Sequence, residues 1–297
     1  MIVVIRDISI EPGELPLPPA GSEPELVYHY AGVSGLKGII EGRCLWASDV
    51  WYMNDAREAL YGFDALERAI QAFAPATSIE SDVRQAALDR LAELENKEDF
   101  LHSYIACLST KRDDLSQWRA YGRPRGFSIG FDRQTLQRLF PPFLDFDRAS
   151  YRVVTYKEDV QNGMLADTLR LMIGRVPTVA PAADAAGIAW LFILESLLLA
   201  PSFKDKAFKD EDEIRLQVLH NPEAGPWSEL KFRDGLTGLT PYVELSLRDP
   251  DGKMSCLREI VVGPQANHAQ AIRAAKLLVG RHELDVEVNP SDIPLRP

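Results

Sequence analysis

The motifs that define several common enzyme classes are absent from this sequence. It contains no GxSxG, GxxxxGK[ST] or HExxH motif, and no GxGxxG following an expected strand. These absences argue against an α/β-hydrolase, a P-loop nucleotidase, a zincin protease and a Rossmann dinucleotide-binding domain. The three cysteines include no CxxC pair and the five histidines show no metal-ligand spacing, so neither a disulfide scaffold nor a metal site is expected.

Positive charge and long apolar runs are also scarce. The chain has 33 Lys+Arg against 44 Asp+Glu, a net charge of −11, which excludes a general binder of nucleic-acid phosphates because that affinity depends on basic residues. The first residues lack the basic start and apolar run of a signal peptide. The most apolar stretch, residues 190–200, contains Glu195 and is short for a membrane span, which needs roughly 20 residues. We therefore expect a buried core helix there, no membrane contact and a cytoplasmic location.

The periodicity of apolar residues predicts an α+β fold. Residues 1–25 are rich in proline and predict an extended N-terminal arm, and residues 26–297 predict a single domain. Alternating apolar and polar residues predict strands at 26–30, 104–109, 127–131, 151–156, 209–218, 243–247, 259–264 and 284–288. Helical spacing and cap residues predict helices at 34–42, 55–73, 81–98, 115–121, 158–173, 184–200 and 265–280. Because no regular βαβ rhythm is present, the sheet should be mainly antiparallel or mixed, with flanking helices.

Two polar features of the sequence point to chemistry. His29 lies on an expected strand between two tyrosines, where it is either a hydrogen-bonded strand residue or a ligand-binding imidazole. Glu211 and Glu213 lead into a later strand, and at strand spacing they share one face, with Cα atoms about 6–7 Å apart. Such a pair either stabilises a developing cation or binds a sugar hydroxyl, or it is only the solvated start of a strand.

A series of short segments occurs in an order that is more specific than any one of them. The segments are Val27-Tyr-His-Tyr30, Gly35-Leu-Lys-Gly-Ile-Ile40, Leu45-Trp-Ala-Ser48, Met53-Asn-Asp-Ala-Arg-Glu58, Ala106-Cys-Leu-Ser109, Ser116-Gln-Trp-Arg-Ala-Tyr121, Gly126-Phe-Ser-Ile-Gly-Phe131, Lys209–Arg215 and Glu259-Ile-Val-Val-Gly-Pro264. As an ordered set covering roughly residues 26–265, they resemble the bacterial domain-of-unknown-function family 2971 (DUF 2971).

The opening of the chain is also similar to that of ADP-ribosyltransferase-like proteins, in which a strand histidine precedes a short helix ending in glycine. Here these residues are His29 and Gly42. The resemblance implies an ADP-ribosyltransferase-like split sheet and an enzyme that cleaves the nicotinamide–ribose bond of its substrate NAD. The transition state of that reaction resembles an oxocarbenium ion. Glu213 would bind the ribose 2′-hydroxyl and stabilise the positive charge, and Glu211 would orient or deprotonate the acceptor.

The same resemblance implies a set of NAD-binding residues. His29 would hold the ribose on the adenosine side, Ser109 would take the place of a serine on a central strand, and Tyr30, Trp118 or Tyr121 would stack on a ring. From their spacing alone, Trp118 and Tyr121 are also explained as core aromatics. The sequence departs from the branch that has Ser and Glu-x-Glu, because it carries a histidine where that branch has an arginine.

The resemblance further implies partners. The acceptor would be a protein or a nucleic acid, and the setting a bacterial toxin or phage-defence effector with a cognate antitoxin or inhibitor. The alternative from another class is a non-catalytic nucleotide- or protein-binding module of a defence system. A metal nuclease has a weaker basis, because alternate residues of the acidic run 210–213 point to opposite faces of a strand. Helix capping is sufficient to explain Asn54 and Asp55, but the sequence leaves their role open. The sequence does not define the oligomeric state.

Overall fold

The computed structural model describes most of the chain in several stretches. They are residues 25–53, 57–94, 102–122, 125–141, 149–179, 183–219, 229–235, 238–265 and 267–294. Apart from Glu25, the expected N-terminal arm lies outside these residues, and so do Asn54 and Asp55 with their expected capping role. The division into an arm and a single domain stays a prediction.

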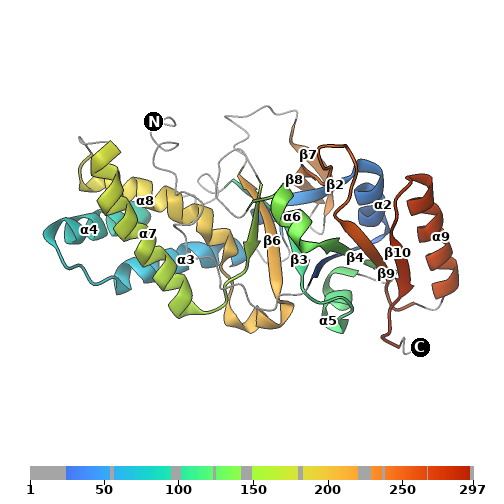
Figure 1. Ribbon diagram of the computed structural model, residues 1–297. Helices are drawn as coiled ribbons and strands as arrows, with labels where there is room; N and C mark the ends of the chain where they lie inside the picture. Colours follow the sequence, from blue (N-terminus) through green and yellow to red (C-terminus); the bar gives the residue numbers. More distant parts are fainter. Residues whose placement is uncertain are drawn as a thin grey trace.

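Ten strands form one sheet in the described part of the chain (Figure 1). They are β1 (Leu26–Ala31), β2 (Cys44–Asp49), β3 (Ser103–Ser109), β4 (Phe127–Asp132), β5 (Ser150–Val153), β6 (Glu213–Leu219), β7 (Lys231–Gly235), β8 (Gly238–Ser246), β9 (Leu257–Val262) and β10 (Glu287–Pro290). Their order is β10-β9-β4-β1-β3-β2-β8-β7, with β6 on β3 and β5 on β6. Only β10 and β9 pair in parallel among these strands, so the expected α+β fold with a mainly antiparallel sheet is confirmed.

The sheet divides at β3. Strand β6 pairs with β3 along its whole length, so β1 and β2 share the other edge of β3. Strand β1 meets that edge only at Ser109, through Tyr28, and β2 meets it at Tyr104 and Ile105. Between these contacts β1 and β2 separate, because β1 continues along β4 and β2 along β8. We call this opening, which lies opposite Cys107, the fork.

Most of the helices lie in two groups, one packed on the sheet and one at the far end of the molecule (Figure 1). They are α2 (Val33–Gly42), α3 (Arg57–Ala72), α4 (Ser78–Ala92), α5 (Leu115–Gln117), α6 (Arg133–Leu139), α7 (Glu158–Val179), α8 (Ala185–Leu199) and α9 (His268–Arg281). Helices α2, α6 and α9 pack on a sheet core that includes Phe127, Ile129 and Phe131 of β4. Helices α3, α4, α7 and α8 gather at the other end around a second core, which touches the sheet at Ile105.

Helix α8 is apolar because other elements surround it. The segment Ala185–Ser202 is long and apolar enough to cross a membrane, the one such segment among the described residues, and 67% of it is buried. It packs against α3, α4 and α7, which confirms the expected buried core helix. Glu195 of α8 is buried as well, and burial raises the pKa of its carboxyl to about 7 although the charge of Arg175 opposes the shift.

Several expected element boundaries differ from the structure. The strand expected at 151–156 ends at Val153, and the one expected at 284–288 begins only at Glu287. Helix α2 begins at Val33 with Gly32 as its N-cap, so Ser34 does not cap it. Strands β2 and β7 had no expected counterpart. Nearly all residues of β2 are buried and most residues of β7 are exposed. Neither strand therefore shows the alternation that identifies a half-buried strand.

Helix α3 makes one close contact that only glycine permits. A Cβ added at Gly62 would lie 2.6 Å from the Cβ of Ala200 and 3.0 Å from its carbonyl oxygen. We expect Gly62→Ala to lower the free energy of unfolding by about 1–3 kcal/mol, because overpacking outweighs the better helix propensity of alanine. In α7, a Cβ at Gly163 meets nothing within 4 Å, so Gly163→Ala should raise the free energy of unfolding by up to about 1 kcal/mol. Urea denaturation measures both changes. Equal changes in the free energy of unfolding of the two variants would contradict the importance assigned to the contact of Gly62 with Ala200.

Candidate functional site

Glu213 is the first residue of β6 and lies in a buried ion cluster. Its Oε1 accepts from Arg215 Nε at 2.8 Å, and its Oε2 accepts from Arg215 Nη2 at 3.0 Å and from Lys204 Nζ at 2.9 Å. Burial alone raises the pKa of this carboxyl, but the charges of Arg215 and Lys204, with the thiol of Cys107, outweigh it and lower the pKa to about 2. The side chain is 6% exposed. Glu213 is therefore ionised at neutral pH and is a poor proton acceptor there.

Glu211 does not share a strand face with Glu213, which corrects the expected geometry. It ends the 3-10 helix η5 (Lys206–Glu211), and Asp212 then turns the chain in the left-handed region, with φ of 47°. The two carboxylates are nevertheless brought together, because Lys204 Nζ also donates to Glu211 Oε2 at 2.5 Å. Glu211 is 23% exposed, and its Oε1 accepts from the hydroxyl of Tyr121 at 3.5 Å. Glu211 is thus the acid of the pair that faces outward.

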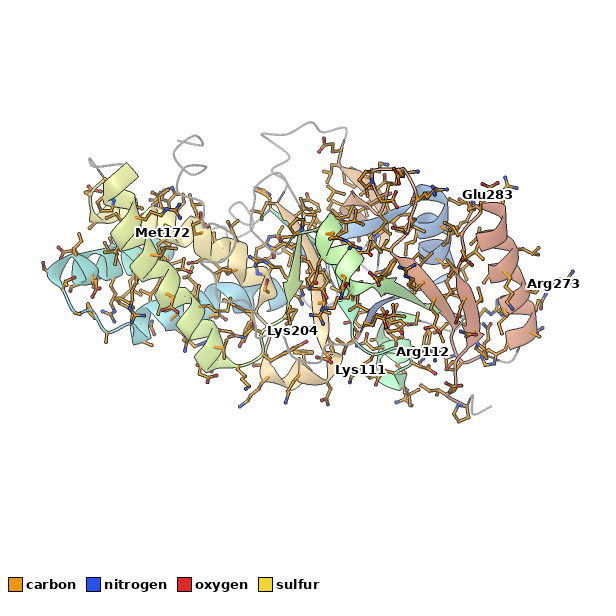
Figure 2. All side chains as sticks on the ribbon, in the orientation of Figure 1. Lys111, Arg112, Met172, Lys204, Arg273 and Glu283 are labelled. Carbon is orange, nitrogen blue, oxygen red and sulfur yellow. The ribbon has the colours of Figure 1, made fainter. Side chains whose placement is uncertain are left out.

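Counted over the described residues, the ion cluster is balanced in charge. Lys204 and Arg215 supply two cations and Glu211 and Glu213 two anions, and the hydroxyl of Tyr156 accepts from the backbone N–H of Glu213 at 2.9 Å. Figure 2 shows Lys204 beside the start of β6, between the sheet and the helices at the other end of the molecule. Sequence reasoning found the two acids but missed the role of Lys204 and Arg215. The signal was available, because acids on a strand buried on both faces require cations.

His29 sits at the fork and joins β1 to β3. Its Nδ1 lies 2.8 Å from the backbone carbonyl of Cys107, and since a carbonyl can only accept, Nδ1 carries the proton. Burial lowers the pKa of the imidazole, and the positive charge of Arg233 lowers it further, against the opposing effect of the bond to Cys107. The ring is therefore neutral at pH 7. In that tautomer Nε2 is a hydrogen-bond acceptor.

His29 of β1 and Glu213 of β6 approach the same residue of β3, Cys107, from opposite edges of that strand. The ring of His29 bonds to the backbone carbonyl of Cys107, and the thiol of Cys107 helps to lower the pKa of the Glu213 carboxyl. In the pairing of β3 with β6, Cys107 stands opposite Arg215 and Ser109 opposite Glu213. Residues far apart in the sequence thus meet at one end of β3, although their chemical roles stay predictions.

Tyr30 and Trp118 are core residues in this structure, so the expected stacking on a ligand ring does not fit them. Tyr30 is 7% exposed and Trp118 5% exposed, and their rings meet edge to face at 4.8 Å. The hydroxyl of Tyr30 donates to the carbonyl of Lys111, and Trp118 Nε1 donates to Asp113 at 2.6 Å. Of the three expected aromatics, only the partly exposed Tyr121 keeps access to solvent.

Ser109 is also turned inward. It is 2% exposed, and its hydroxyl donates to the backbone carbonyl of Glu211 at 2.6 Å while accepting from the backbone N–H of Lys111. Ser109 therefore fixes the end of η5 against β3 and positions Glu211, and it does not present its hydroxyl to a ligand as expected. Figure 2 shows Lys111 and Arg112 at this same end of the sheet.

These features define an α+β protein with a forked, mainly antiparallel sheet and an ion cluster across β3 from the fork. Residues 117–216 match the model of DUF2971, described as a protein of unknown function. The match confirms the resemblance over that stretch, which includes Tyr121 and the four charged residues of the ion cluster but not His29. No curated protein matches the chain. No solved structure matches it either. Among the described residues, no group of three or more His, Cys, Asp or Glu could hold a metal ion.

Proposed function

We propose that this chain is an ADP-ribosyltransferase-like enzyme that binds NAD at the fork and cleaves its nicotinamide–ribose bond. The observation that carries the proposal is that a neutral imidazole and one carboxylate of an acidic pair both approach Cys107 of β3. His29 reaches Cys107 from the fork and Glu213 reaches it through the thiol. A ribose needs both kinds of group, since its hydroxyls donate to acceptors and its anomeric carbon becomes positive in the transition state.

Glu211, rather than Glu213, is the carboxylate that the proposal assigns to the reacting ribose. Glu213 is enclosed by two cations, whereas within the described part of the chain Oε1 of Glu211 has only the long contact with the hydroxyl of Tyr121. As the C1′–N bond breaks, nicotinamide leaves as a neutral molecule with the bonding electron pair. The positive charge left on the ribose lies beside Glu211, and the acceptor then bonds to C1′ and loses its proton to solvent.

The other residues hold the reacting groups in place. The Nε2 atom of His29 accepts a hydrogen bond from a ribose hydroxyl, since its tautomer is fixed by the bond to Cys107. Lys204 is a positioning residue, because its ammonium group fixes Glu211 relative to Glu213. Burial raises the pKa of Tyr121, so its phenol stays neutral and its ring is available to a ligand ring.

Chromatography of nicotinamide released from NAD tests the proposal. The purified protein should release nicotinamide, and in the presence of an acceptor labelled ADP-ribose should appear on that acceptor. In cells, the proposed effector role predicts toxicity that Glu211→Gln relieves. Absence of both NAD binding and nicotinamide release by the folded protein would contradict the enzyme proposal.

A non-catalytic nucleotide- or protein-binding module is the second candidate, and the charge balance of the ion cluster favours it. Two cations against two anions leave little net negative charge to stabilise a developing cation. This candidate predicts that NAD or a related nucleotide binds to the protein but is recovered intact after long incubation. The chromatographic assay therefore separates the two candidates.

A further inference from the structure

Arg233 of β7 is a half-buried cation without a carboxylate partner among the described residues. Its Nη2 donates to the hydroxyl of Ser48 at 2.8 Å, and its Nη1 makes a longer bond of 3.3 Å to the backbone carbonyl of Asp234. Burial lowers the pKa of this guanidinium, and only the phenol of Tyr242 acts in the other direction. A desolvated arginine in a chain of net charge −11 is unusual, because acids to neutralise it are abundant.

The strand pairing places this guanidinium at the fork. Ser48 of β2 stands opposite Ile105 of β3 on one side and Tyr242 of β8 on the other. The side chain of Arg233 therefore reaches across β8 to Ser48 of β2. Ile105, the β3 residue opposite Ser48, lies two residues from Cys107. His29 holds the carbonyl of Cys107 from the β1 side, so an arginine and an imidazole lie on the two sides of the same opening.

Neighbouring acids do not neutralise Arg233. Glu244 of β8 pairs with Lys231 at 2.7 Å. Asp234 follows Arg233 on β7, so its side chain points to the opposite face of the strand. Asp49 caps the short helix η1 (Val50–Tyr52) by accepting from the backbone N–H of Trp51. The positive charge at the fork is therefore uncompensated within the described part of the chain.

We propose that Arg233 and Ser48, together with His29, form a binding site for the phosphate and an adjoining sugar hydroxyl of a nucleotide. Guanidinium donors bind phosphate oxygens with matching planar geometry. The hydroxyl of Ser48 accepts from Arg233 and keeps its own proton to donate to a phosphate oxygen. The Nε2 atom of neutral His29 accepts from the sugar hydroxyl. The site thus binds both the anion and the sugar. Free phosphate fills only the first half of the site, and a nucleoside fills only the second.

This inference does not depend on cleavage of NAD. A nucleotide held at the fork is recognised in the same way whether it reacts at Glu211 or remains bound unchanged. The binding experiment therefore uses ADP, inorganic pyrophosphate and adenosine as separate probes, none of which contains a nicotinamide–ribose bond.

Isothermal titration calorimetry of the full chain measures the three affinities. ADP should bind more tightly than pyrophosphate or adenosine. Arg233→Gln should weaken ADP and pyrophosphate at least about tenfold, the effect of one charge-assisted hydrogen bond, and leave adenosine unchanged. Arg248→Gln is the matched control, because Arg248 is an exposed arginine that follows the same hairpin. Circular dichroism confirms that both variants are folded.

The outcomes separate this inference from the proposed function. Equal ADP affinity in wild type and Arg233→Gln, or no ADP binding at all, would overturn the nucleotide site. Arg233-dependent ADP binding without any NAD cleavage would support the site while the enzyme proposal fails. NAD cleavage with an unchanged KM in Arg233→Gln would support the enzyme and overturn the site. If Arg233→Gln does not fold, Arg233→Lys replaces it and should give a smaller loss of the same sign.

Discussion

Glu213→Gln is expected to lower the free energy of unfolding by about 3–5 kcal/mol, because it removes the charge that two buried cations share. Arg215 is 1% exposed and Lys204 3% exposed, so water cannot replace the lost carboxylate. The amide of glutamine keeps the shape but supplies only one acceptor oxygen. Urea denaturation followed by circular dichroism measures the loss.

Glu244→Gln is the matched control for this substitution. Glu244 also forms an ion pair, with Lys231 at 2.7 Å, but the side chains are 37% and 45% exposed. An exposed pair of this kind contributes about 0–1 kcal/mol. Similar losses in the two variants would contradict the importance assigned to the buried cluster.

The effect of Glu213→Gln should depend on pH in a defined direction. The pKa of Glu213 is lowered in the folded protein from its ordinary value of 4.5 to about 2. Its stabilisation is thus fully present above pH 4.5 and is lost as the pH falls toward 2. The difference in stability between wild type and variant should shrink across that window, and a difference that grows on acidification would contradict the assignment.

Glu211→Gln is expected to lower kcat for nicotinamide release by about 100-fold to 1000-fold. Removal of one group that stabilises charge in a transition state has effects of this size. The KM for NAD should change less, since Glu211 is assigned to the charge that appears only as the bond breaks. Glu211 is partly exposed, and Lys204 keeps its ion pair with Glu213 in this variant. The melting temperature should therefore fall by no more than a few degrees.

Glu41→Gln provides the control for activity. Glu41 lies on α2 in an exposed i,i+4 pair with Lys37, so its removal should leave nicotinamide release unchanged. If Glu211→Gln and Glu41→Gln release nicotinamide at the same rate as the wild type, the carboxylate assigned to the reaction is wrong.

The sequence predicted β4 well because its pattern reflects packing on one face. Phe127, Ile129 and Phe131 all enter the sheet core, and Gly130 on the other face leaves space for the ring of Tyr28, which would lie 2.8 Å from an added Cβ. Strand β2 was missed because five of its six positions are buried. A strand enclosed on both faces has no reason to alternate polar and apolar residues.

The candidate site was predicted in its residues but not in its geometry. The reading of Glu211 and Glu213 as neighbours on a strand failed at Asp212, whose positive φ ends η5 before β6 begins. A single residue in the left-handed region leaves no periodic signal. Lys204 was overlooked because its partners follow it across η5, and only the folded chain brings its ammonium group between the two acids.

The role of His29 also depended on topology. Its position between two tyrosines indicated a special strand residue, but its partner is the backbone carbonyl of Cys107, at the place where β1 and β2 separate on β3. Arg233 reaches the same opening from β7, a strand that the sequence did not predict. Neighbourhoods created by the branching of a sheet follow from strand order, which local periodicity does not encode.

A crystal structure of the Glu211→Gln variant with bound NAD tests the central claim most directly, since the slowed reaction should leave the substrate intact. The nicotinamide ribose is expected within hydrogen-bonding distance, about 3 Å, of residue 211, with a sugar hydroxyl on Nε2 of His29. NAD bound away from the fork would contradict it.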